Sequence, residues 1–428
     1  MNVKSPMLIA VLLGSTSLIA TNSAAAMSDV TPEAVIENYA NIAEAKYADS
    51  LITAKALDAA IDAFLAAPTD TTLAAAKGAW LASRVPYQQT EVYRFGNAIV
   101  DDWEGKVNAW PLDEGLIDYV DASYGTESDE NTLYTANVIS NASIKINGDD
   151  VDASAITPAF LSETLHEAGG IEANVATGYH AIEFLLWGQD LNGNDQGAGK
   201  RPATDFSLTD CTNGSCDRRR EYLKAASELM ISDLEEMAAN WVAGGAARKA
   251  LEDAGTSGSL STILTGMGSL SYGELAGERM KLGLLLGDPE EEHDCFSDNT
   301  HNSHLYDAIG IQNVYLGTYK RVDGSIVSGA SLMDLVKAKD AGVAAELEAD
   351  LAATVDAMQV MAKRADAGEA YDQMIGEGNV EGNAVVQAAI DGLVKQTKSI
   401  ERAIAALELG TIELEGSDSL DNPNAVFQ

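Results

Sequence analysis

The sequence contains little positive charge and few aromatic residues. Its 428 residues include 27 lysines and arginines against 66 acids, which gives a formal net charge of -39, and only 6% are aromatic. The longest run of basic residues is three arginines at 218–220, which is too short to offset this charge. A surface that binds phosphates would therefore have to form against the overall field. These absences exclude nucleic acid as an expected partner and favour a surface that attracts cations.

Common enzyme signatures are also missing from the sequence. The chain contains no His-Glu-x-x-His helix, no Gly-x-Ser-x-Gly elbow, no phosphate-binding Gly-Lys-Ser/Thr loop and no Cys-x-x-Cys-His haem motif. Any catalytic function must therefore use a less familiar constellation of residues.

Long apolar runs are absent beyond the N-terminus, so no transmembrane span is expected. The first residues carry Lys4, then the apolar run "MLIAVLLGSTSLIA", then small residues that end near Ala26. This order is typical of a secretory signal peptide, which we expect at 1–26. The mature chain is then periplasmic or associated with the outer membrane. A retained amphipathic anchor is the alternative.

Cysteine occurs three times. Export to an oxidising compartment permits disulfides, and Cys211 and Cys216 enclose the short polar loop "CTNGSC". We therefore predict a disulfide between them in preference to a metal site. Cys295 then has no cysteine to pair with. It is either a reactive or metal-binding thiol or a small buried residue.

The abundance of alanine, leucine and acids predicts an all-α fold. Helices are expected at 31–66, 156–187, 217–242, 258–287, 331–366 and 380–409, with another after Pro68 that Pro86 should kink. Segment 287–317 is rich in Asp, Asn, His and Gly and is expected to be a functional loop. Two successive groups of about four helices indicate two up-and-down bundles packed against each other. The expected parts are a signal peptide (1–26), an N-terminal bundle (27–187), a connecting loop (188–216), a C-terminal bundle (217–410) and an acidic tail (411–428).

The first candidate site is the apolar stretch "GYHAIEFLLWGQD", residues 178–190. Helical spacing brings His180 and Glu183 close together on a helix that is covered on both sides. Because a buried carboxylate is costly unless it is paired or bound to a metal, the two side chains could share one cation. The alternative is a His–Glu hydrogen bond in the core.

A second stretch carries Trp80, Arg84, Tyr87 and Glu91 on one predicted helical stripe. They are candidates for a polar pocket in which Arg84 orients a carboxylate and Glu91 adds an oxygen ligand. The alternative is an amphipathic rim whose Arg and Tyr reach water.

A third stretch places Arg279 on an apolar helical stripe, where a buried arginine requires a partner. The loop that follows supplies Asp298, Asn299, Thr300, His301 and His304, a concentration of potential ligands. Solvent exposure is the alternative for His293 and His304.

Together these stretches resemble the imelysin family, in particular its iron-regulated protein A-like branch. Gly178, His180 and Glu183 match the family's Gly-x-His-x-x-Glu signature, and "CTNGSCDRRREYL", "SYGELAGERM" and "EEHDCFSDNTH" resemble further hallmarks. The likeness extends from about residue 31 to residue 410. It implies a secreted protein with two helical bundles and a functional site between them. It also implies two competing functions, because some relatives are described as metallopeptidases and others as components of iron acquisition.

The sequence therefore predicts an exported metal-binding protein that acts in iron acquisition, with His180, Glu183 and Glu91 as candidate ligands. Iron is the expected metal and zinc the alternative, bound as a bare ion or as a chelate, and envelope iron-uptake components are the expected partners. A zinc-dependent peptidase is the second hypothesis, although such a site needs three ligands and an open position. The third is a module that binds an envelope polymer or partner protein, which requires Arg84 and Arg279 to be exposed.

Overall fold

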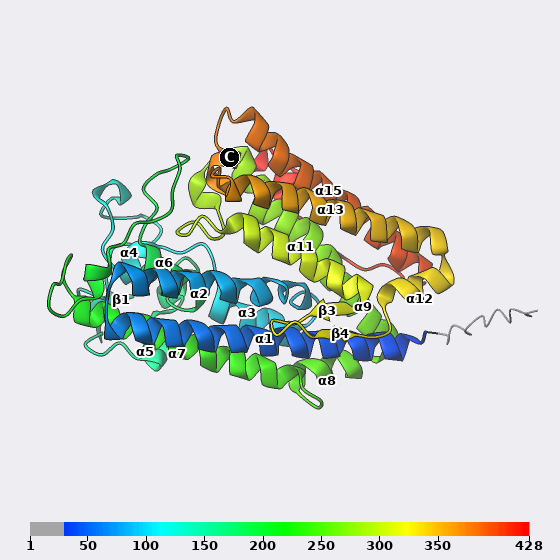
Figure 1. The fold of residues 1–428 in the computed structure, drawn as a ribbon, viewed down its shortest axis with the longest axis horizontal. Helices are drawn as coiled ribbons and strands as arrows, with labels where there is room; N and C mark the ends of the chain where they lie inside the picture. Colours follow the sequence, from blue (N-terminus) through cyan, green and yellow to red (C-terminus); the bar gives the residue numbers. More distant parts are fainter. Residues whose placement is uncertain (1–29, 428) are drawn as a thin grey trace, which may run out of the picture.

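The computed structural model describes residues 30–427, which are mostly helical with two short β-hairpins (Figure 1). The predicted all-α fold is confirmed. The predicted signal peptide at 1–26 lies outside the described residues. Between residues 30 and 427, no helix combines the length and apolar character needed to cross a bilayer.

Several of the longer helices, among them α1, α7, α13 and α15, coincide with the strongest sequence patterns. Their bounds are α1 (Pro32–Ala66), α2 (Asp70–Gln88), α3 (Ala98–Asn108), α6 (Gly178–Trp187), α7 (Cys216–Trp241), α8 (Ala246–Asp253), α9 (Gly255–Ser269), α11 (Thr300–Leu316), α12 (Leu332–Lys339), α13 (Ala341–Asp366) and α15 (Val380–Ala406). A π-helical stretch, Leu270–Lys281, continues α9 into α10 (Leu282–Leu286). The short elements are α4 (Glu114–Ile117), α5 (Pro158–Phe160), α14 (Tyr371–Ile375), α16 (Asp418–Asp421) and the hairpins β1–β2 (Ser143–Ile146, Asp149–Asp152) and β3–β4 (Thr318–Lys320, Ile326–Ser328).

Local capping fixes where the first two helices begin. The Thr31 side chain accepts a hydrogen bond from the Ala34 amide at 3.2 Å, and proline occupies the first position of α1. Thr69 and Thr72 form a capping box at the start of α2. Pro86 stands in the last turn of α2, which ends two residues later. The predicted stripe through Glu91 is therefore interrupted, and Glu91 begins a separate 3₁₀ turn.

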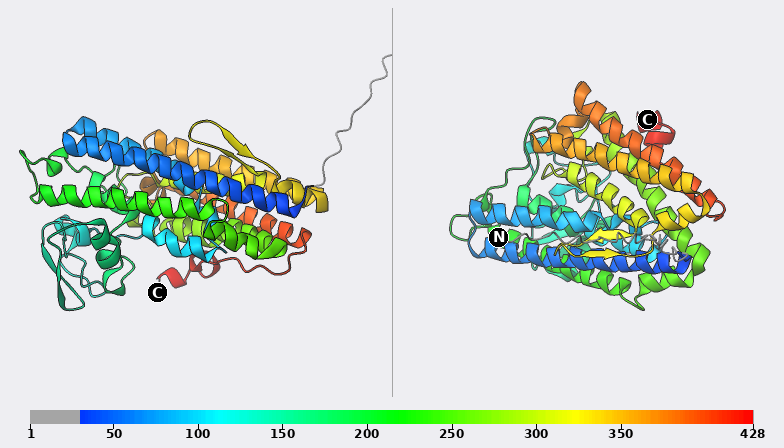
Figure 2. Two further views of the ribbon diagram at one scale, coloured as in Figure 1. Left: turned by 90° about the horizontal axis from the view of Figure 1, so that it is seen from below. Right: turned by 45° about the vertical axis from the view of Figure 1, so that its right-hand side comes forward.

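The long helices form two layers (Figure 1). In the lower layer of Figure 1, α1 packs against α2 and α7, and α6 contacts both α2 and α7. In the upper layer, α13 packs against α11 and α15. This grouping differs from the expected boundary at 188–216, because α7 follows that segment in sequence but packs with α1. The loop-rich part after α3 gathers at one end of the lower layer (Figure 2).

Helix α11 corrects the expectation of a loop across 287–317. It begins at Thr300 and contacts α2 in one layer and α13 in the other. Because the helix is covered from several sides, buried polar residues such as His304 and Asp307 interrupt any apolar stripe. The polar composition of this segment therefore reflects a buried polar network and not a surface loop.

The predicted helix at 156–187 is also shorter than expected. After α5 and a π-helical turn, the chain leaves helical geometry near Gly169 and Gly170 and re-enters it at Gly178. Gly178 has a φ of +76°, and a Cβ there would stand 2.3 Å from the Val107 carbonyl oxygen. Glycine therefore allows α6 to begin directly against the end of α3.

The predicted disulfide and the C-terminal tail are both defined in the structure. The disulfide between Cys211 and Cys216 is present. The acidic tail packs against the molecule, since the Ser419 hydroxyl donates to the Gly277 carbonyl at 2.9 Å and the Tyr272 hydroxyl donates to Asp421 at 2.7 Å.

Candidate metal centre

The pair on α6 is fully buried: His180 is 1% exposed and Glu183 is 0% exposed. Nδ1 of His180 lies 3.0 Å from Oε2 of Glu183, so the two groups share a hydrogen bond. Within residues 30–427, Nε2 of His180 is buried and has no hydrogen-bond partner. Because buried polar atoms are nearly always satisfied, this nitrogen is the atom of the pair that requires an explanation.

The segment that leads into α11 brings two further donors to His180. The imidazole of His293 packs edge-on against that of His180, with 4.8 Å between ring centroids. Oδ1 of Asp294 lies 3.9 Å from Nδ1 of His180. Each of these three residues offers one ligand atom, and the three atoms lie within 4.8 Å of one another. Two imidazoles and one carboxylate suit iron, zinc and related transition metals.

Asp294 is held firmly in this position. Nη2 of Arg84 donates to its Oδ1 at 2.7 Å, and the Asn299 amide donates to its Oδ2 at 2.8 Å. The Ser303 hydroxyl also donates to Oδ2. Arg84 therefore pairs with the carboxylate of Asp294, and its Nη2 also lies 3.3 Å from Nδ1 of His293.

The protonation states follow from burial. Burial, with Arg84 in addition, lowers the pKa of His180 to about 3, and burial lowers the pKa of His293 well below its usual value. Both imidazoles are therefore neutral near pH 7, the form that binds metals. Burial and then Asp294 raise the pKa of Glu183 well above its usual value. Burial opposes the charge on Asp294, but Arg84 and the hydrogen bonds outweigh it, so its pKa is lowered.

Aromatic side chains form the wall behind Arg84. The guanidinium lies 4.9 Å from the Tyr179 ring centroid and 5.5 Å from that of Trp80. Nε1 of Trp80 donates to the Tyr179 carbonyl at 3.0 Å, which ties α2 to α6. Tyr87 packs on Tyr179 with 4.8 Å between centroids. Trp80 and Tyr87 are both buried beside Arg84.

Glu91 lies in a different cluster. Its Oε2 accepts a hydrogen bond from Arg279 at 2.7 Å, and Arg279 also contacts Glu274 at 2.7 Å and Asp307 at 3.3 Å. The partner that a buried Arg279 requires is therefore a set of three acids, which includes the residue predicted as a third metal ligand.

The other predicted loop residues lie in two further places. His301 is 8% exposed, and its Nε2 contacts the Asn302 amide. His304 is fully buried against Tyr371. Asp298 joins Glu292 and Asp372 in a second group of carboxylates. Burial raises the pKa of Asp298 to about 7 and that of Asp372 to about 6.

Cys295 lies beside the centre as a free, half-buried cysteine. Burial, followed by the negative charge of Glu183, raises the pKa of its thiol well above the usual value. The thiolate needed for reactivity or metal binding is therefore disfavoured, which supports the small-residue alternative.

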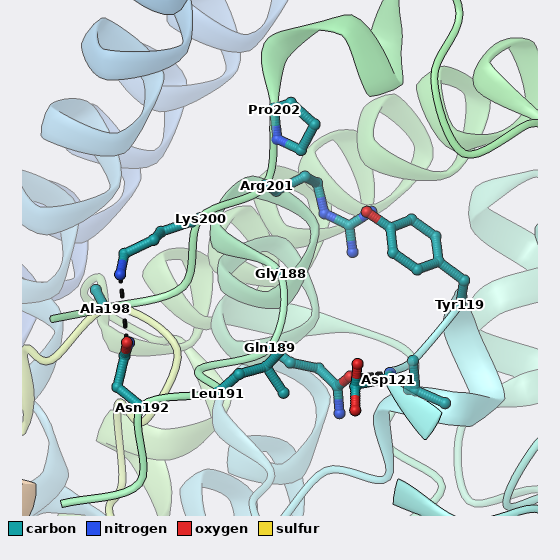
Figure 3. Close-up of a pocket in the computed structure, with 11 residues that line it drawn as sticks. Tyr119, Asp121, Gly188, Gln189, Leu191, Asn192, Ala198, Lys200, Arg201 and Pro202 are labelled. Carbon is teal, nitrogen blue, oxygen red and sulfur yellow. Dashed lines mark hydrogen bonds between the residues drawn. The ribbon is translucent and has the colours of Figure 1, made fainter. Parts of the chain in front are cut away.

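An acidic pocket of about 810 Å³ extends to His293. Nine acids and two arginines line it together with His293, and the acids are Asp101, Asp102, Glu104, Glu167, Glu172, Glu274, Glu278, Glu290 and Glu291. A concave surface with this excess of negative charge concentrates cations. A separate pocket of about 390 Å³, shown in Figure 3, lies along the connecting loop between Tyr119 and Lys200 and shares no lining residue with the acidic pocket.

The sequence singled out His180 and missed Asp294 as its neighbour. Asp294 stands in "EEHDCFSDNTH", where acids are so common that one more gives no signal. Solvent exposure was one of the two alternatives for His293, but the residue is only 3% exposed. Only the approach of segment 292–299 to α6 reveals that the two residues belong with His180.

Fold and site together define a class: a mostly helical protein with a buried histidine–carboxylate centre between α6 and the segment that enters α11. The chain belongs to the imelysin family, which is designated a peptidase family and whose model matches residues 43–400. It is similar to the iron-regulated protein A of Synechococcus elongatus, with 30% identity over 104 residues. That match covers 24% of this chain and 26% of the relative, so it spans about a quarter of either protein.

Two solved structures share the fold. One, from Parabacteroides distasonis and described as an iron-regulated protein A precursor, aligns with a TM-score of 0.62 and 18% identity over 89% of this chain and 97% of that one. An imelysin-like protein from Psychrobacter arcticum aligns with a TM-score of 0.55 and 16% identity over 90% of this chain and 99% of that one. At these identities the likeness supports the fold alone.

Proposed function

We propose that this protein binds a metal ion, iron in the first place, at His180, His293 and Asp294, and serves iron acquisition in the cell envelope. The observation that carries the proposal is Nε2 of His180, a buried nitrogen without a hydrogen-bond partner in the described part of the chain. A bound cation would satisfy this nitrogen. The similarity to iron-regulated protein A supports iron as the cargo.

The residues around the centre fit this role. When Nδ1 of His180 carries the proton and donates to Glu183, its Nε2 presents a lone pair, the arrangement by which carboxylates orient metal-binding histidines. In this proposal Glu183 positions His180 instead of binding the metal itself. Arg84 positions Asp294 in the same manner. The acidic pocket that reaches His293 supplies a route for cations.

Export is part of the proposal. The disulfide between Cys211 and Cys216 suits an oxidising compartment, and the sequence of residues 1–26 has the pattern of a secretory signal. Envelope iron-uptake components are then the proposed recipients of the metal.

Burial weighs against the two other hypotheses. A peptidase centre must admit a polypeptide, whereas His180 and His293 are 1% and 3% exposed. The polymer-binding hypothesis requires exposed arginines, whereas Arg84 and Arg279 are 1% and 3% exposed. Binding of a small cation is the function that this geometry supports best.

The test is metal binding by untagged protein, measured by calorimetry with Fe²⁺ under anaerobic conditions and by the absorption spectrum of bound Co²⁺. His180→Ala and His293→Ala should each lose stoichiometric binding and retain their helical circular dichroism. His166→Ala is the matched control, since His166 is partly buried but lies outside the three-residue group, and it should bind like wild type. Unchanged binding in both site variants would contradict the proposal.

A further inference from the structure

A second group of acids includes residues directly before and after the segment that carries His293 and Asp294. Glu292, Asp298 and Asp372 each offer a carboxylate oxygen, and these oxygens lie within 4.8 Å of one another. Glu292 and Asp298 flank the segment, and Asp372 comes from α14. None of the three residues belongs to the histidine centre described above.

Four of the six carboxylate oxygens in this group are buried and have no hydrogen-bond partner among the described residues. Asp372 is 1% exposed, and for neither of its oxygens do the described residues supply a hydrogen-bond donor in suitable geometry. The backbone amide of Gln373 is near enough to lower its pKa but does not reach hydrogen-bond geometry. Oε2 of Glu292, a residue that is 1% exposed, and Oδ1 of Asp298 also lack a partner between residues 30 and 427. Buried carboxylates of this kind are costly unless a cation accompanies them.

In the described part of the chain, no lysine or arginine forms an ion pair with these three carboxylates. Lys200 acts on Asp298 only at a distance, and its Nζ donates to Asn192 instead, at 3.3 Å. The connecting loop therefore covers the group without neutralising it. Its Asn194 amide donates to the Asp372 carbonyl at 2.8 Å, and the Gly199 amide donates to the Phe296 carbonyl at 2.9 Å.

We propose that Glu292, Asp298 and Asp372 form a second metal site, specific for a hard divalent cation of the Ca²⁺ class. Oxygen-only donors favour calcium, magnesium or manganese, whereas the nitrogen donors of the histidine centre favour transition metals. The remaining coordination positions are open to carbonyls and water. A cation there binds α14 to the segment that presents His293 and Asp294, under the cover of the connecting loop. This site goes beyond the proposed function and does not depend on it.

The experiment is calorimetric titration of chelator-treated, untagged protein with Ca²⁺ alone, followed by Mg²⁺ and Mn²⁺. Wild type should bind one Ca²⁺ per chain, and Ca²⁺ should slow proteolytic cleavage of the loop at 188–199. Asp372→Asn and Asp298→Asn should both lose this binding. Asp356→Asn, which removes the same charge from an exposed position on α13, is the matched control and should bind like wild type.

The two sites can be separated in the same experiment. His180→Ala should retain Ca²⁺ binding, and Asp298→Asn should retain transition-metal binding, so either proposal can fail alone. If Asp372→Asn loses its helical circular dichroism, Asp298→Asn decides, because Asp298 is only half-buried. Absence of binding of all three ions by wild type, or Ca²⁺ binding by Asp298→Asn equal to that of wild type, would overturn the second site.

Discussion

Asp118 and Asp372 are both buried aspartates, but their surroundings are opposite. Asp118 accepts hydrogen bonds from Arg219 at 2.6 and 2.9 Å and from Arg201 at 2.6 Å. Arg201 lies beside the Tyr119 ring in the pocket of Figure 3, and Asp205 completes a group of two acids and two arginines. Asp372 has acidic neighbours, and no arginine of residues 30–427 pairs with it.

The difference separates a structural cluster from a candidate binding site. Within the Asp118 cluster the charges cancel, so the protein itself satisfies the buried acid. Around Asp372 and around Nε2 of His180, the described residues leave donors or acceptors unused. Nε of Arg201 in the Asp118 cluster also lacks a partner among the described residues, so one unsatisfied atom does not define a site. Unsatisfied acceptors on side chains whose ligand atoms converge, as at His180 and at Asp372, mark the places at which a ligand is expected.

The largest effect is expected from breaking the balanced cluster. Arg219→Ala removes the bidentate partner of Asp118 and leaves Arg201 as its remaining arginine, which should destabilise the protein by about 3 kcal/mol. Urea unfolding followed by circular dichroism measures the change. Metal binding at both proposed sites should persist in the folded fraction, since neither site includes Arg219.

Arg402→Ala is the control for that comparison. Arg402 forms a two-pronged pair with Glu346, but both side chains are more than 40% exposed. Its removal should cost at most about 1 kcal/mol. Equal losses in the Arg219 and Arg402 variants would mean that burial adds nothing to the Asp118 cluster.

A change of pH should have a smaller effect on the free energy of unfolding. Burial opposes the charge of Asp118, but Arg201 and Arg219 outweigh it, so the pKa of Asp118 in the folded protein is lowered. Its contribution to stability is therefore fully present above the pKa of the unfolded chain, about 3.9, and is lost as the pH falls through the lower folded value. The difference in unfolding free energy between wild type and Asp118→Asn should be constant from about pH 5 to 8 and shrink below about pH 4. A difference that grows on acidification would contradict this assignment.

The same comparison explains how far the sequence could be interpreted. The apolar pattern and the capping residues predicted α1, α7, α13 and α15. The apolar residues on either side of His180 in the sequence predicted its burial. The sequence could not predict α11, because a helix buried on several sides loses the periodicity that identifies it. It could not place Asp294 either, since its role depends on a contact between distant segments.

Glu91 illustrates that limit, and its substitution should have a small effect on stability and none on metal binding. The predicted helical stripe grouped it with Arg84, but α2 ends before it, and its carboxylate turns to Arg279. Glu91→Gln keeps an oxygen acceptor for Arg279, which retains the carboxyl groups of Glu274 and Asp307 as partners, so the stability loss should be about 1 kcal/mol. Fe²⁺ affinity, measured by calorimetry, should equal that of wild type, because the proposed ligands are untouched. Loss of stoichiometric Fe²⁺ binding in a folded Glu91→Gln variant would restore Glu91 as a ligand and would require the centre to rearrange around Arg279 when the metal binds.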